Sequence, residues 1–317
     1  MAFLWLDGEK QARLVAALGN AHAWLVLRDA EFRSLWPQGT TPEDENPKPE
    51  SLATFAWTDA NNDGRPQPAE VQFFKERSGG ITVMNDLSFV VAQFGDKNVR
   101  FAASINATGL PRYDLTKPEN LGPAGGHQPS SGGNQSLTEP GGWTITTNAP
   151  DPFSPYGLGG KFQGEPRWSY PSPWPGLHAS HEAAVPDRPG MVVGHTRLLG
   201  GWVHGAAGPM FCINGNMGNM SLFTADGLFV STLFHDIRLR PNWAAPVATR
   251  NMDVTDVSLH DENFWPSITQ TTDGRVFVVD GGRTSLVRVE AATRSNVCPR
   301  PRSPSAPTTC SGRATGS

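Results

Sequence analysis

The sequence predicts an all-β fold: a β-propeller, or a fragment of one, built of short antiparallel meanders with long Gly/Pro-rich loops. The 317 residues include 34 Gly and 28 Pro and are only 18% charged, a composition rich in turn-forming residues. Short apolar runs follow one another between these turns. Such strands suit a propeller or a sandwich, and a blade period of about 40 to 50 residues fits a propeller, but the repeat is not strict enough to count the blades.

In the first third of the chain, the candidate strands are short apolar runs bounded by turn residues. They cover residues 3–6, 12–18, 22–27, 53–57, 71–74, 81–84, 88–94 and 99–103. A polar, acidic and Pro-rich loop separates two groups of them at 38–51. Strands this short need neighbours, so we expect antiparallel sheets.

The middle of the chain differs in character. Residues 106–142 hold Gly, Pro, Ser and Asn with almost no apolar periodicity, which indicates a long surface loop or a domain boundary. Further short strands are expected at 143–147, 167–170, 191–193 and 210–214.

Two hairpins are the clearest local structures. Residues 221–224 and 228–234 flank the turn Asp226-Gly227, and residues 267–272 and 275–279 flank Asp273-Gly274. An Asp-Gly pair between apolar runs is a strong hairpin signal. A last strand is expected at 285–289. We therefore expect one propeller-like domain over 1–290 and a disordered tail over 291–317, which has almost no large apolar residue to bury.

Charge and cysteine content narrow the classes of function. Acidic and basic residues are interspersed and the formal net charge is −4, so no basic patch marks a nucleic-acid site. No apolar run approaches the roughly 20 residues of a membrane-spanning helix. Cys212, Cys298 and Cys310 show no CxxC spacing, and Cys212 lies in an apolar stretch where we expect it to be buried.

The N-terminal segment lacks the charged and apolar regions of a signal peptide. We therefore expect either a cytoplasmic protein or an internal piece of a longer exported chain.

The sharpest motif runs from Asp59 to Glu70. It places oxygen donors at loop positions 1, 3, 5, 9 and 12, with glycine at position 6. Calcium binds about six to eight oxygens, and this spacing can wrap them around the ion. The expected calcium ligands are Asp59, Asn61, Asp63, the Arg65 carbonyl, Gln67 and Glu70.

This segment resembles the EF-hand calcium loop in every liganding position. It departs from that pattern in Pro66, where EF-hands usually carry an aliphatic residue, and in flanks that read as strands rather than helices. We therefore expect a single calcium loop with a structural role, not a paired EF-hand domain. The alternative is a solvated Asn-Asp-Gly turn that binds no ion.

A second candidate site is a cluster of histidines and tryptophans. Five of the eight histidines lie between Trp168 and Asp236. They could ligate a metal or supply an acid and a base. The alternative is that they pack within a proline-rich loop. The candidate ligand-binding residues are Trp174, His178, His181, His195 and Asp236.

Four segments, 168–181, 213–218, 222–230 and 264–270, resemble parts of large, poorly characterised bacterial β-propeller proteins related to PQQ-like or NHL-type repeats and often found in planctomycetes. The resemblance covers roughly 53–289. It implies an extracytoplasmic propeller, periplasmic or at the cell surface, of which this chain supplies the last blades. It implies no particular activity and no catalytic residues.

Three functions follow from these observations. The first is a calcium-stabilised propeller that binds a glycan or a partner protein through Trp174, His178 and His181. The second is an enzyme, namely a lyase, hydrolase or quinone-dependent dehydrogenase, that uses the histidines and Asp236; no nucleophile elbow, phosphate loop or dinucleotide fingerprint narrows this class. The third is an incomplete propeller whose open strand edges drive self-association.

Overall fold

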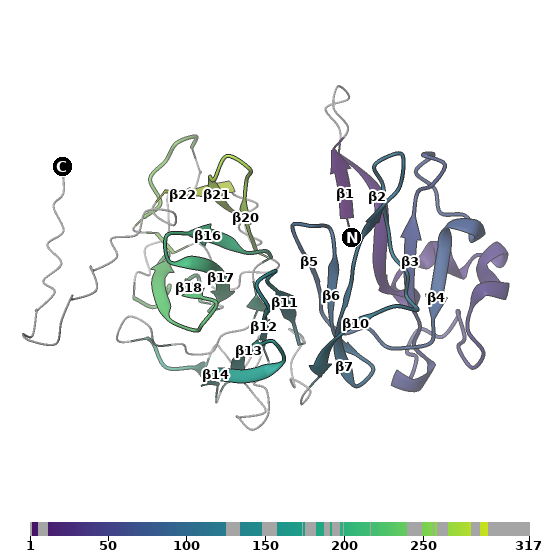
Figure 1. Ribbon diagram of the computed structural model, residues 1–317, viewed down its shortest axis with the longest axis horizontal. Helices are drawn as coiled ribbons and strands as arrows, with labels where there is room; N and C mark the ends of the chain where they lie inside the picture. Colours follow the sequence, from purple (N-terminus) through teal and green to yellow (C-terminus); the bar gives the residue numbers. More distant parts are fainter. Residues whose placement is uncertain are drawn as a thin grey trace, which may run out of the picture.

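The computed structural model is all β, as predicted, and its small antiparallel sheets are arranged as a five-blade propeller (Figure 1). Within the described residues, the helical segments are short 3₁₀ helices. The structure describes residues 2–5, 12–124, 134–147, 157–172, 174, 182–186, 191, 197–198, 200–215, 217–239, 249–255, 257–258, 266–279 and 286–290.

Blades 1 and 2 come from the first 123 residues. Blade 1 has the strand order β1 (Ala2–Trp5), β2 (Ala12–Asn20), β3 (Thr54–Thr58), β4 (Val71–Phe74). Blade 2 has the order β5 (Ile81–Val83), β6 (Phe89–Phe94), β7 (Lys97–Phe101), β10 (Glu119–Pro123). Between β7 and β10, a separate hairpin pairs β8 (Ser104–Ile105) with β9 (Pro111–Arg112).

Blades 3 and 5 follow in the same meander order, whereas in blade 4 both β15 and β16 pair with β17. Blade 3 consists of β11 (Ser136–Thr138), β12 (Trp143–Thr146), β13 (Gly157–Phe162) and β14 (Glu165–Pro171). Blade 4 consists of β15 (Arg197–Leu198), β16 (Val203–Gly205), β17 (Gly208–Asn214), β18 (Met220–Thr224) and β19 (Phe229–Leu233). Blade 5 consists of β20 (Ser267–Gln270), β21 (Val276–Val279) and β22 (Leu286–Val289).

Apolar side chains fill the spaces between successive blades. One cluster joins blades 1 and 2 around Phe89 and Phe101, and another joins blades 4 and 5 around Met210 and Val278. On its other face, blade 1 is covered by the 3₁₀ helices η1 (Ala21–Ala23), η2 (Leu25–Arg28) and η3 (Ala30–Leu35). The sheets thus stabilise one another by burying apolar area.

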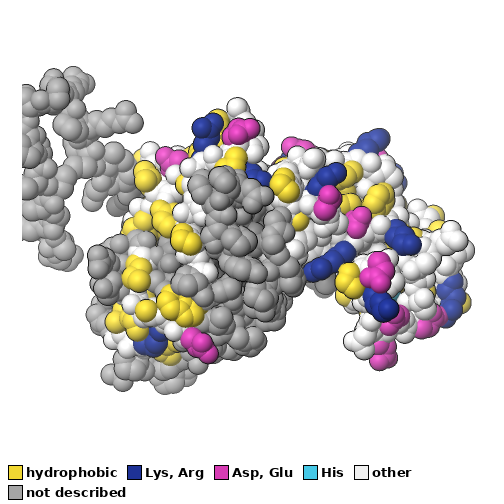
Figure 2. All heavy atoms as spheres, turned by 90° about the horizontal axis from the view of Figure 1, so that it is seen from below, with side chains coloured by type: hydrophobic (Ala, Val, Ile, Leu, Met, Phe, Trp, Pro, Cys, Tyr) yellow, Lys and Arg dark blue, Asp and Glu magenta, His cyan; other side chains and the backbone are white. Residues whose placement is uncertain are grey.

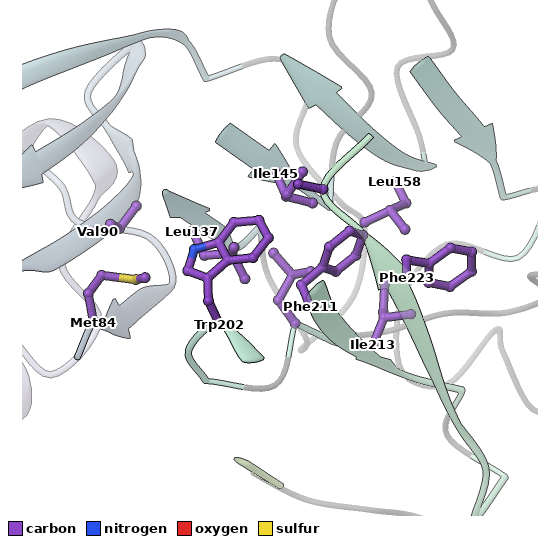
Figure 3. Packing of buried hydrophobic residues seen from close by; sticks show 11 residues of the cluster. Met84, Val90, Leu137, Ile145, Leu158, Trp202, Phe211, Ile213 and Phe223 are labelled. Atoms are coloured by element: carbon purple, nitrogen blue, oxygen red, sulfur yellow. The ribbon is translucent and has the colours of Figure 1, made fainter. Parts of the chain in front are cut away.

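The largest of these clusters, here called the central cluster, joins blades 2, 3 and 4. Figure 3 shows Trp202 and Phe211 close together, with Met84 and Val90 of blade 2 facing them. Phe211 is fully buried and stacks on Trp168 of blade 3 and on Phe223. The buried members of the central cluster are Met84, Val90, Leu137, Ile145, Leu158, Leu198, Trp202, Phe211, Ile213, Phe223 and Ala225.

Close backbone approach also joins the blades. Gly200 forms a parallel bridge with Ile268 between blades 4 and 5, and a Cβ at Gly200 would lie 2.9 Å from the Ile268 carbonyl oxygen. Its φ of 66° is in the left-handed region, so this position requires glycine on both counts.

Most predicted strands are confirmed, including both Asp-Gly hairpins, but two of the predicted regions differ and β13 was not predicted. The strand expected at 22–27 is wrong. The Asn20 side chain accepts a hydrogen bond from the His22 amide and starts a 3₁₀ turn, and Leu27 is buried against blade 1. The segment 106–142 contains β9, β10 and β11, so it supplies the outer strand of blade 2 and the first strand of blade 3.

The environment of Cys212 is as expected, because it is buried in β17. Burial raises the pKa of its thiol to about 12, so the thiol stays protonated at neutral pH. The predictions for 191–193, Cys298, Cys310 and the tail 291–317 fall wholly or largely outside the described residues.

The surface carries charges of both signs. Figure 2 shows Lys and Arg next to Asp and Glu over the described part of one face. Over the residues that the structure describes, no helix has the length and apolar character that a membrane crossing needs.

Phe211→Ala is expected to lower the free energy of unfolding by about 3–5 kcal/mol, because it removes a buried ring that blades 3 and 4 share. Denaturant unfolding followed by tryptophan fluorescence measures this. Leu228→Ala, at a side chain that is 63% exposed, is the control and should change stability by less than about 0.5 kcal/mol. Equal effects of the two variants would contradict the packing described here.

Candidate functional site

The predicted calcium loop connects β3 to β4 at one end of blade 1. Both flanking segments are strands, as the sequence indicated, and the loop ends in a single 3₁₀ turn, η5 (Pro68–Glu70). Asn62 and Gly64 have φ values of 68° and 75°. These two left-handed residues turn the backbone sharply within three positions.

The side chains at positions 3, 5 and 9 of this loop meet at one point. The Asp63 Oδ2 atom accepts hydrogen bonds from Asn61 Nδ2 at 3.1 Å and from Gln67 Nε2 at 2.6 Å. The backbone amide of Arg65 is the main cause that lowers the pKa of the Asp63 carboxyl below its ordinary value, so Asp63 is negatively charged at neutral pH. Rotating each amide group by half a turn would turn the Asn61 and Gln67 oxygens toward the same point.

The remaining two carboxylates hold the loop backbone. Asp59 is buried, and its two oxygens accept from the amides of Asp63 and Gly64 at 3.0 and 3.1 Å. Glu70 Oε1 accepts from the amides of Ala60 and Asn61 at 2.8 and 3.1 Å. These hydrogen bonds close the loop.

The donor set fits a hard cation only if amide and carbonyl oxygens take part. Among the described residues, no group of three His, Cys, Asp or Glu side chains is placed to hold a metal. Asn61, Gln67 and the Arg65 carbonyl would therefore have to complete the coordination, as they do in the expected ligand set.

Only part of the predicted histidine and tryptophan cluster can be placed. His178, His181 and His195 lie outside the described residues, and Trp174 is half-buried. Asp236 is 4% exposed and pairs with Arg238 at 2.7 Å. Arg238 also donates to the Ala183 carbonyl at 2.5 Å. The Asp236 carboxylate therefore orients the Arg238 guanidinium, which ties two loops together.

Two aromatic residues of the same region have structural roles. The Trp168 indole nitrogen donates to the Ala225 carbonyl at 3.0 Å, and the Tyr170 hydroxyl donates to the Gly227 carbonyl. Gly227 has a φ of 87°, and a Cβ there would lie 2.6 Å from the Trp168 ring. Strand β14 of blade 3 is therefore anchored on the Asp-Gly turn of blade 4.

The structure also shows a cleft that the sequence did not predict. This interblade cleft, of about 480 Å³, lies where blades 2, 3 and 4 meet. Its walls come from the β5–β6 loop, from β7 and β10, from the β11–β12 loop and from the β15–β17 region. The residues that the argument below uses are Met84, Asn85, Asp86, Arg100, Glu119, Glu139, Trp202 and His204.

On the blade 2 side, Arg100 holds the wall in place. Its guanidinium pairs with Asp86 at 2.6 Å and with Glu119 at 2.8 Å, and it donates to Ser88 Oγ at 3.1 Å. Burial alone would raise the pKa of the Asp86 carboxyl. Hydrogen bonds from Ser88 and Arg100 together outweigh burial, so this pKa lies below its ordinary value of 3.8.

On the other side, hydrogen bonds between blades fix the wall. The Trp202 indole nitrogen donates to the Thr138 carbonyl across blades 3 and 4. The Gln270 side chain of blade 5 accepts from the His204 amide at 2.8 Å and donates to the His204 carbonyl at 3.0 Å. These contacts place the exposed His204 side chain at the cleft.

Sequence patterns could not reveal this cleft, because its residues come from segments more than 100 positions apart. Among them, the sequence drew attention to His204 alone, as one of the five clustered histidines. Comparison with protein-family models and with curated proteins gives no match. The class defined by the fold is therefore a five-blade propeller that has a charged cleft between three of its blades.

Asp86→Asn is expected to make the free energy of unfolding depend less on pH in the acid range. A lowered folded-state pKa contributes stability above the unfolded value, and this contribution disappears as the pH falls through the folded value. The wild type should therefore lose more stability than the variant as the pH falls below the ordinary pKa of 3.8, as measured by urea unfolding. Asp29→Asn, at an exposed residue without a side-chain cap bond, should leave the acid side as in the wild type. Parallel curves for all three proteins would contradict the role given to Asp86.

Proposed function

We propose that this chain is a calcium-stabilised β-propeller binding module whose ligand is a glycan or a partner protein. The observation that carries the binding function is the interblade cleft, which three blades build and which hydrogen bonds between blades hold open in one geometry. Polar and charged side chains make up most of its walls, and placed polar groups on a rigid scaffold give a site its specificity for a polar ligand.

Calcium has a structural role in this proposal. The loop between β3 and β4 brings Asn61, Asp63 and Gln67 together and keeps Asp63 charged. A cation would neutralise the charge of Asp63. It would also tie the loop to blade 1 through Glu70, because Glu70 accepts a hydrogen bond from the Trp57 indole nitrogen at 3.2 Å. Since such a site binds the folded chain, calcium must raise its stability.

The test is thermal unfolding with calcium and with excess chelator. Calcium at about 100 times its dissociation constant should add about 2.7 kcal/mol, which corresponds to a rise in Tm of about 5 °C. The calcium-dependent rise should disappear in Asp59→Ala with Glu70→Ala. The difference between the two conditions is the readout, because Asp59 is buried and its loss also affects the fold itself.

Two further variants sharpen this test. Asp63→Ala removes an exposed ligand at lower structural cost and should also abolish the calcium-dependent rise, whereas Glu45→Ala, in the exposed acidic loop, should retain it. Equal Tm values of the wild type in calcium and chelator would show that the loop is a solvated turn.

The alternative function is an enzyme that uses the histidine cluster, and it rests on His178, His181, His195 and Asp236. Replacing both His178 and His181 with alanine distinguishes it from a structural loop. If the cluster forms the site, ligand binding or turnover should fall by about tenfold or more. If both survive the double substitution, the cluster is structural. A transition metal bound by the wild type and lost from the variant would favour the enzyme.

We further propose that the chain belongs with the bacterial PQQ-like or NHL-type propellers that it resembles, and that it acts outside the cytoplasm. In the described residues, blade 5 has three strands where blades 1 to 3 have four. Self-association through an open strand edge is the corresponding proposal for a partner, and light scattering over a range of concentrations tests it.

A further inference from the structure

We propose that the interblade cleft binds an amino sugar, a ligand that combines ring hydroxyl groups with a protonated amine. This inference rests on the proposed binding function and gives its ligand a chemical class. Three properties of the cleft support it, namely its charge, its hydrogen-bonding groups and the packed residues that form its floor.

The cleft carries more negative than positive charge. Its lining has the carboxylates of Asp86, Glu119 and Glu139 against the single guanidinium of Arg100. Arg100 already pairs with Asp86 and Glu119, so it has little charge left for an anion. Phosphate or carboxylate ligands would be repelled, whereas an ammonium group is attracted.

Glu139 is the carboxylate best placed to take the ammonium group. Its Oε2 atom accepts from the Gly141 amide at 2.7 Å, which fixes the side chain over the β11–β12 turn. Within the described part of the chain, Glu139 has no ion pair. An N⁺–H donor that reaches Glu139 would therefore form a charge-assisted hydrogen bond and supply the missing positive charge.

The opposite wall suits hydroxyl groups, which both donate and accept. The side chains of Asp86 and Glu119 are 54% and 56% exposed despite their pairing with Arg100, so they retain free acceptor positions. Asn85 adds both a donor and an acceptor at the same wall. A linear amine without hydroxyl groups would leave these groups to water.

The floor of the cleft is rigid. Met84 and Trp202 line the cleft and also belong to the central cluster, where Figure 3 shows them among buried side chains. Trp202 is itself buried, so its ring supports the floor and offers little open face for stacking. Recognition therefore depends on the polar walls, which are ordered before a ligand arrives.

The experiment is isothermal titration calorimetry of the whole chain, in calcium, with three probes: a β-1,4-linked glucosamine tetramer, cellotetraose and spermidine. The two tetrasaccharides differ in having an amine or a hydroxyl at C2 of each ring. The glucosamine tetramer should bind about tenfold or more tightly than either other probe. This preference should weaken as salt is raised.

Glu139→Gln should lower the affinity for the glucosamine tetramer by about tenfold and leave Tm unchanged, because glutamine still accepts from the Gly141 amide. Glu165→Gln, at an exposed carboxylate of the same blade and outside the cleft, is the matched control and should bind as the wild type does. Equal losses in both variants would overturn the placement in the cleft.

The other outcomes separate the two proposals. Equal affinity for the two tetrasaccharides would overturn the claim that the cleft recognises an amine, and the proposed glycan-binding function would stand. Equal affinity for spermidine and the glucosamine tetramer overturns the sugar ring as part of the ligand. Absence of binding to all three probes overturns this inference, whereas the calcium-dependent Tm and binding of a protein or another glycan decide the proposed function independently.

Discussion

Apolar side chains packed between neighbouring sheets hold this molecule together. A single sheet of three to five short strands buries too little area to be stable by itself, and each blade here completes its core with side chains from the next. The central cluster is the most demanding case, because Phe211 meets Trp168 of one blade and Trp202 and Phe223 of its own. Since this packing fixes the distance between blades 2, 3 and 4, it also fixes the loops that form the cleft.

Polar contacts act at the edge of this packing and set the finer geometry. Arg100 orders the carboxylates of blade 2, and the Trp202 indole nitrogen joins blade 4 to a carbonyl of blade 3. Such bonds add little stability at half-exposed positions, but each forms only when its donor and acceptor have one particular distance and orientation. The apolar clusters therefore determine that the blades meet, and the polar contacts determine how the cleft is shaped.

Local patterns allowed much of the fold to be predicted. The turns at Asp226-Gly227 and Asp273-Gly274 identified their hairpins directly. Strand β13 was missed because its sequence, GLGGKF, lacks apolar alternation; its glycines are needed there because the Trp168 ring lies where a Cβ at Gly160 would be. The acidic loop could be recognised because all its donors lie within twelve residues. The cleft could not, because it exists only after three blades have packed.

The Gln270 side chain gives the last blade an influence on a cleft to which it contributes no wall. Its amide group pairs with both backbone groups of His204, so β20 helps β17 to hold His204 at the cleft. Local opening of blade 5 would release this part of the rim and lower the fraction of molecules competent to bind. By reciprocity, an occupied cleft that orders His204 makes opening of blade 5 less favourable. One coupling free energy thus links the affinity of the cleft for its ligand to the free energy of local opening of blade 5.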